Sequence, residues 1–137
     1  MFKNFDRLML CATNSVCLTF VTVLVGKIDY ALIFLLIGMI TDFVTGVLCG
    51  FYNKNLSSNT AIKGLMKKLF ILVYVMLAHH LDVLLNTQYI RTAVCYLYAT
   101  GEVLSIIENG STLGLPVPEP IKKALEILNG GDENDEK

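Results

Sequence analysis

Hydrophobic residues gather in four long stretches along this chain, at about residues 8–25, 30–51, 69–85 and 89–107. An α-helix rises about 1.5 Å per residue, so a stretch of roughly 20 apolar residues crosses a hydrocarbon core about 30 Å thick. The pattern therefore predicts an all-α integral membrane protein with four transmembrane helices. Polar residues dilute the first stretch. It either spans the membrane or lies at the membrane interface, and in the second case three spans remain. No small-residue cleavage site follows it, so we interpret it as an uncleaved segment rather than a signal peptide.

Asp42 interrupts the second stretch, in an otherwise almost unbroken apolar run over residues 29–52. A carboxylate at mid-bilayer depth costs about 2.5–3.5 kcal/mol on insertion scales, and it tends to face protein or water rather than lipid. Gly38, Gly46 and Gly50 recur with Asp42 at intervals of four residues and form one small, polar strip on the helix. We expect this strip to pack closely against another helix, either within one subunit or between subunits.

Polar residues also follow one face of the fourth stretch, and a sparser polar seam on the third contains Lys68, His79 and Asp82. A very short connection over residues 86–88 predicts that these two stretches form an antiparallel hairpin, in which Arg91 pairs with Asp82. Glu102 lies too deep for that pairing, and it either meets a partner on another helix or lines water. The candidate buried polar or pore-lining residues are Asp42, Thr45, His79, Asp82, Arg91, Glu102, Ser105 and Asn109.

Lysines concentrate at two places, between the second and third stretches and after the fourth. Positive residues near the ends of spans favour the cytoplasmic side, and these lysines also suit contact with lipid headgroups. The sequence therefore predicts a transmembrane domain over residues 1–112. Residues 113–137 are then a cytoplasmic proline-rich link, a short amphipathic helix and an acidic tail. The lysines on which this orientation rests are Lys54, Lys63, Lys67, Lys68, Lys122 and Lys123.

Composition supports one small membrane unit, because 54% of the 137 residues are hydrophobic and only 17% are charged. The net charge of −1 implies no electrostatic attraction to nucleic acid. His79 and His80 are adjacent, so their side chains diverge by about 100° on a helix and do not suit one metal ion. We identify no catalytic constellation, cofactor site or metal site. The cysteines have no spacing typical of a disulfide or a metal site, and they are Cys11, Cys17, Cys49 and Cys95.

Several short motifs occur in a characteristic order over about residues 29–128. The first half contains Asp42-Phe43-Val44-Thr45-Gly46, Gly50-Phe51, Leu56-Ser57-Ser58, Lys63-Gly64 and Lys67-Lys68. The second half contains His79-His80-Leu81-Asp82, Arg91-Thr92-Ala93, the run from Glu102 to Asn109, and Gly114-Leu115-Pro116-Val117-Pro118. In these motifs the chain resembles the toxin-secretion/phage-lysis holin family.

This resemblance implies a small bacteriophage or prophage protein of the bacterial cytoplasmic membrane that oligomerises into lesions. Such lesions let an endolysin reach the cell wall or let a large toxin leave the cell. Small-residue strips, polar seams and buried charges with too few partners inside one subunit favour the same function. One alternative is a small dimeric four-helix transporter or ion channel that uses Asp42 or Glu102 as its binding carboxylate. Another is a membrane anchor for a partner protein, in which the buried acids are structural.

Overall fold

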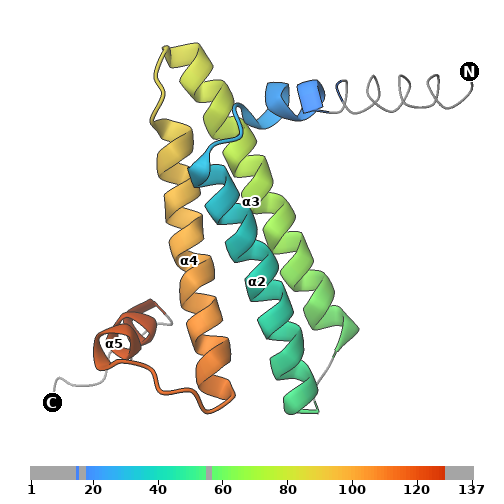
Figure 1. Cartoon of the computed structure of the whole chain (residues 1–137), viewed down its shortest axis with the longest axis vertical. Helices are drawn as coiled ribbons and strands as arrows, with labels where there is room; N and C mark the ends of the chain where they lie inside the picture. Colours follow the sequence, from blue (N-terminus) through green and yellow to red (C-terminus); the bar gives the residue numbers. More distant parts are fainter. Residues whose placement is uncertain (1–14, 16–17, 55–56, 129–137) are drawn as a thin grey trace, which may run out of the picture.

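The protein is described here by a computed structural model, which covers residue 15 and residues 18–54 and 57–128. Three long helices lie side by side as a bundle, and a short fourth helix follows them (Figure 1). All three long helices are long and apolar enough to cross a membrane. The described residues contain no strand, so the predicted all-α class is confirmed. The helices are α2 (Tyr30–Tyr52), α3 (Ser58–Leu85), α4 (Ile90–Thr112) and α5 (Glu119–Leu128).

The hairpin between α3 and α4 is built around the carboxylate of Asp82. Asn86 ends α3 in the left-handed conformation, with φ of 53°, which turns the chain back toward the bundle. The Asp82 carboxylate then accepts hydrogen bonds from the N–H groups of Ile90 and Arg91, at 3.1 and 2.9 Å. It also accepts one from the Thr87 hydroxyl at 2.6 Å. Asp82 therefore satisfies backbone donors at the start of α4 that no helical carbonyl reaches.

The hydrophobic core lies in the half of the bundle that contains this hairpin. Over the whole bundle α4 packs against both α2 and α3, whereas α2 and α3 make little contact with each other. Gly38 allows close packing of α2 on α4, because a Cβ atom at this position would lie 3.3 Å from Cβ of Glu102. The buried core residues are Ala31, Leu32, Leu35, Met39, Val75, Cys95 and Ala99.

Residues 18–25 are helical and run across the bundle rather than parallel to its three helices (Figure 1). Gly26 follows them with φ of 83°, and a Cβ atom there would lie 2.7 Å from Nδ1 of His79. Only glycine fits this bend without strain. Half of the first predicted stretch, residues 8–25, lies outside the described residues. Three of the described helices have the length and hydropathy of a span, where four were expected in the whole chain.

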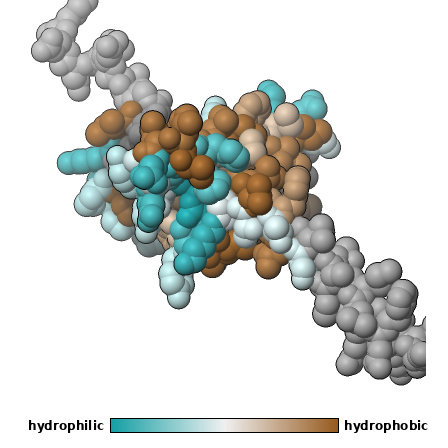
Figure 2. Space-filling model, turned by 90° about the horizontal axis from the view of Figure 1, so that it is seen from above, coloured by the Kyte–Doolittle hydropathy of each residue, from teal (hydrophilic) through white to brown (hydrophobic). Residues whose placement is uncertain are grey.

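The outer surface of the bundle is strongly hydrophobic. Viewed along the helices, hydrophobic residues make up much of the outline and hydrophilic residues gather over part of the end face (Figure 2). Ile40, Phe51 and Leu97 are 66%, 67% and 69% exposed, and they lie on α2 and α4. A water-soluble protein rarely exposes continuous apolar surface of this extent. The surface therefore suits contact with lipid hydrocarbon.

Candidate functional site

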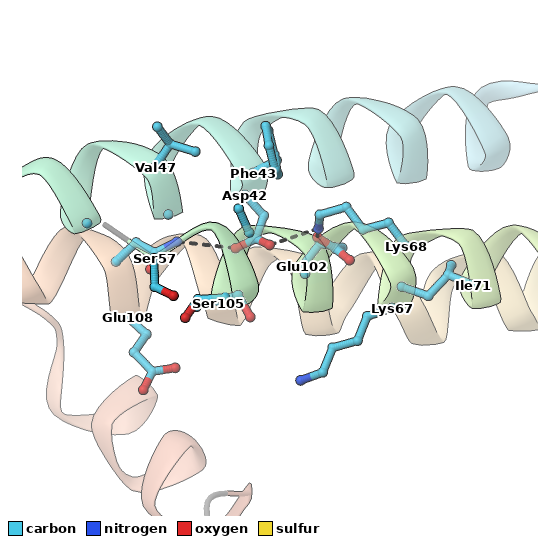
Figure 3. Close-up of a pocket in the computed structure, with 16 residues that line it drawn as sticks. Asp42, Phe43, Val47, Ser57, Lys67, Lys68, Ile71, Glu102, Ser105 and Glu108 are labelled. Atoms are coloured by element: carbon cyan, nitrogen blue, oxygen red, sulfur yellow. Dashed lines mark hydrogen bonds and ion pairs between the residues drawn. The ribbon is translucent and has the colours of Figure 1, made fainter. Parts of the chain in front are cut away.

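One ion-paired cluster joins the three long helices near the middle of α2. Lys68 on α3 donates from Nζ to Oδ2 of Asp42 on α2, at 2.8 Å, and to Oε2 of Glu102 on α4 (Figure 3). Their side chains are only 12%, 21% and 8% exposed, in the order Lys68, Asp42 and Glu102. We call these three residues the triad. With both carboxylates ionised, the triad carries one more negative charge than positive charge.

Asn109 extends the triad toward the end of α4. Its Nδ2 donates to Oδ1 of Asp42 at 3.2 Å and to Oγ1 of Thr45 at 3.0 Å. Its backbone carbonyl accepts from Sγ of Cys49 at 3.0 Å. The predicted polar face of α4 therefore meets the predicted polar strip of α2 inside one subunit. Within the described residues every buried side-chain nitrogen and oxygen has a hydrogen-bond partner. The expectation that the buried charges lack partners inside one subunit is thus corrected.

A cleft of about 480 Å³ leads from the triad toward the loop between α2 and α3. All three long helices line it, and it occupies the half of the bundle opposite the hydrophobic core. Lys67 and Glu108 also border the cleft but point away from the triad (Figure 3). Water in the cleft would solvate the triad from one side. It would lower the free-energy cost of holding charged side chains within the membrane. Other lining residues are Gly46, Gly50, Ser57, Thr60, Gly64 and Ser105.

A second charged cluster lies at the other end of the bundle, around Arg91. Its Nη1 donates to the carbonyl oxygens of Val25 and Lys27, at 3.2 and 2.8 Å, and its Nη2 pairs with Asp29. The expected ion pair between Arg91 and Asp82 is therefore corrected, because Asp82 accepts from the Arg91 backbone N–H instead. Arg91 fixes the connection that precedes α2.

The remaining predicted site residues separate into two groups. Gly46 and Gly50 line the cleft, where the nearest atom to an added Cβ at Gly46 is Nδ2 of Asn109 at 3.7 Å. His79 instead packs against Gly26, far from the cleft along α3. The pattern of the sequence does not distinguish these two environments, because both groups lie on the polar faces of helices.

The surroundings of Lys68 differ from those expected. The sequence predicts that it belongs to a group of lysines at the membrane surface, whereas its side chain turns inward to two carboxylates. Its place on the polar seam of α3, with His79 and Asp82, was the available signal. The other lysines of that group face outward: Lys54, Lys63, Lys67 and Lys123 are exposed, and Lys122 pairs with Glu119 at 3.1 Å.

The chemistry available at these clusters is that of ion pairs and hydrogen bonds. Among the described residues no three His, Cys, Asp or Glu side chains are arranged to hold a metal ion. Cys49 and Cys95 are buried free thiols. The triad can change its charge, its hydration or its partners, and each of these changes would alter how α3 packs against α2 and α4.

Comparison with known proteins gives matches over most of the chain. The profile of the bacteriophage holin family matches residues 19–130. An uncharacterised 14.9 kDa protein of Clostridium perfringens is 42% identical over 113 residues, which cover 81% of this chain and 86% of that protein. A protein described as a probable holin from Bacillus phage phi105 is 28% identical over 138 residues, which cover 100% of this chain and 93% of that protein. No solved structure matches the chain.

Proposed function

This chain belongs to the bacteriophage holin family, and from that premise we propose that it oligomerises and permeabilises the membrane as a non-enzymatic pore former. It is a multi-pass protein of the bacterial cytoplasmic membrane. The pores that we propose are large enough for a folded endolysin or a large toxin to cross. Both cargoes need the same property, which is a lesion wider than an ion channel.

The observation that carries this proposal is the cleft that ends at the charged triad. Glu102, Asp42 and Lys68 hold charge near the middle of helices whose outer faces are apolar. The triad is paired within the subunit, but lipid tails cannot hydrogen-bond to the exposed polar side chains that border the cleft, such as Lys67 and Glu108, so an isolated subunit in lipid leaves these groups poorly satisfied. Assembly around water would expose the same polar surface to solvent and lower that cost.

Self-association is supported by the small residues of α2. Gly46 lines the cleft and is exposed, so its missing side chain leaves room for another helix. In lipid the hydrophobic effect does not drive helices together, so close packing of their backbones is a main contribution to helix association. Gly38, in contrast, is buried against Glu102 in the same subunit. We therefore assign Gly46 and Gly50 to contacts between subunits and Gly38 to the internal packing of one subunit.

The orientation that we propose has the loop between α2 and α3 in the cytoplasm, together with residues 113–137. Exposed Lys54, Lys63 and Lys67 lie at this end of the bundle, and exposed Lys123 follows α4. The cleft then opens toward the cytoplasm, and the connection held by Arg91 lies at the outer side. With three spans, this arrangement places the start of α2 outside the cell.

The alternative function, a small dimeric transporter or channel, assigns Asp42 or Glu102 to solute binding. Both carboxylates accept hydrogen bonds from Lys68, which already provides their cation. A binding carboxylate would have to release Lys68 before it took a solute. This internal pairing favours the pore-forming function over the transporter.

Purified chain reconstituted into liposomes tests the proposal. The liposomes enclose a folded enzyme together with a small dye, and release of each is followed over time. A pore former releases both, at a protein density above a threshold. Saturable movement of a small solute with the enzyme retained would support the transporter, and retention of both tracers would support a membrane anchor.

A further inference from the structure

A second cavity, of about 610 Å³, lies on the outer face of α3 and α4. Its walls are apolar and include Met66, Phe70 and Ile71, and the stacked rings of Tyr74 and Tyr98 lie at its inner end with centroids 5.6 Å apart. From residue 63 to residue 74, α3 rises roughly 16 Å, which is close to the thickness of one bilayer leaflet of about 15 Å. The groove therefore has the length of an acyl chain within one leaflet.

Two lysines border the opposite end of this groove. Lys63 and Lys67 are one turn apart on α3, so they lie on the same face of the helix. Both are exposed, and neither has an ion-pair partner among the residues that the structure describes. Lys68 differs, because both of its carboxylate partners belong to the triad. The groove thus combines apolar walls with two unpaired positive charges at one end.

We propose that this groove binds an anionic glycerophospholipid, with its phosphate between Lys63 and Lys67 and one acyl chain along Met66 and Phe70. The charges match such a lipid in sign, since lysines at one end of a span attract anionic headgroups, and the long side chains of Lys63 and Lys67 can reach toward the membrane surface. The lipid belongs to the cytoplasmic leaflet, an assignment that rests on the orientation proposed above. Lipid binding itself does not depend on pore formation, so the two proposals fail separately.

Binding to the purified, delipidated chain in detergent tests the role of the lysines. The probes are phosphatidylglycerol and phosphatidylcholine with identical acyl chains, and the readout is the dissociation constant of each. Phosphatidylglycerol should bind more tightly. Lys63→Gln or Lys67→Gln should weaken its binding about fivefold and the double variant about thirtyfold, because each lysine near a headgroup contributes about 1 kcal/mol. Lys54→Gln is the matched control and should leave the constant unchanged.

A groove-filling variant tests the role of the apolar walls. Met66→Trp should weaken phosphatidylglycerol binding, whereas Ile40→Trp on the exposed face of α2 should not. Helix content by circular dichroism and the elution profile confirm that each variant is folded. Free glycerol phosphate should not compete, because it lacks the acyl chain that the groove holds.

Three results would overturn the proposal. Equal affinity for the two lipids would mean that the groove binds the acyl chain without selecting for the charge of the headgroup. Sensitivity to the lysines but not to Met66→Trp would mean that anionic lipid gathers at the surface without entering the groove. Rapid disulfide formation by Met66→Cys, in a chain without the native cysteines and regardless of added lipid, would mean that a second copy of the chain occupies it.

Discussion

Lys68 connects the three long helices through a single ammonium group. Two carboxylates, from Asp42 and Glu102, accept its hydrogen bonds, and the three side chains are largely buried. Removing one member of a buried ion pair leaves the other charge without compensation, which costs more than the pair itself contributes. The triad is therefore sensitive to the loss of Lys68 in particular, because that loss leaves two carboxylates facing each other.

Lys68→Met should destabilise the bundle by about 3 kcal/mol, because it leaves two buried carboxylates without a cation. The free energy of unfolding in mixed micelles of detergent and denaturing surfactant measures this loss. Lys67→Met is the matched control, since the neighbouring lysine is exposed and outside the triad, and it should change stability by less than about 0.5 kcal/mol. Equal stability of the two variants would contradict the role assigned to Lys68.

Glu102→Gln keeps the shape and hydrogen-bonding capacity of the side chain but removes its charge. It should insert normally and change the time at which lesions appear, because the triad then holds one carboxylate and one ammonium group. Glu102→Leu should do more harm, since it also removes the polar group. The time course of dye release from liposomes measures both effects, with Glu119→Gln as the control, because Glu119 is exposed on α5 and does not line the cleft. Parental timing in both Glu102 variants would exclude a role for this carboxylate in opening.

The polar faces of the helices are predictable from the sequence, but the partners of individual side chains are not. Asp42 and Glu102 stand out because each interrupts an apolar stretch, and Asn109 continues the polar face of the fourth stretch at helical spacing. The partner of Arg91, in contrast, is Asp29, which lies 62 residues away. That pairing depends on how α4 is rotated against the connection before α2, and local spacing carries no information about this rotation.

At the scale of the helix, α2 has two kinds of glycine. Gly38 packs inside the subunit, and Gly46 borders the cleft. Gly38, Asp42, Gly46 and Gly50 recur every four residues, which predicts one continuous strip of small and polar residues but leaves open which part of it faces the same subunit. The structure separates the two parts, because an added Cβ at Gly38 would lie 3.3 Å from Cβ of Glu102, whereas the nearest atom to an added Cβ at Gly46 is Nδ2 of Asn109 at 3.7 Å.

Gly46→Leu should impair assembly while leaving the subunit folded, because the new side chain occupies the surface proposed for contact between subunits. Gly38→Leu should instead destabilise the subunit, since its Cβ alone would lie 3.3 Å from Cβ of Glu102. Crosslinking and elution profiles in mild detergent measure assembly. Gly101→Leu is the control, because no atom lies within 4 Å of an added Cβ there. An unchanged oligomer distribution in Gly46→Leu would exclude this strip as an association surface.

Helix formation is also well predicted by the apolar pattern, because each long run needs internal hydrogen bonds in lipid. The bounds depend on finer chemistry. In the structure α3 starts at Ser58, so polar turns precede the apolar part of the helix. The crossing direction of residues 18–25 follows from Gly26 and the Arg91 contacts, and hydropathy alone does not indicate it.

The whole molecule is divided into a packed half and an open half. Apolar side chains fill the half near the hairpin, and the cleft occupies the half near the loop between α2 and α3. Over their whole lengths α2 and α3 make little contact with each other, and Lys68 links them through Asp42. Opening of the bundle should therefore begin at the cleft, which lies outside the packed core.

The proposed orientation predicts that the cleft end faces the cytoplasm. A cysteine at Ser58, in a chain without the native cysteines, should be protected from a membrane-impermeant reagent added to intact cells and labelled after the cells are opened. A cysteine at Gln88, in the hairpin between α3 and α4, is the matched control and should be labelled in intact cells. The reverse pattern would invert the topology and would move the proposed lipid site to the outer leaflet.

Co-expression with an endolysin that lacks any export signal tests the central claim most directly. Neither protein alone should lyse the cells, because the endolysin stays in the cytoplasm and the proposed pore former leaves the cell wall intact. The two together should cause abrupt lysis once lesions form, and optical density records the time of this event. Intact cells in the presence of both proteins, with the chain present in the membrane and the endolysin active in extracts, would contradict the proposed pore.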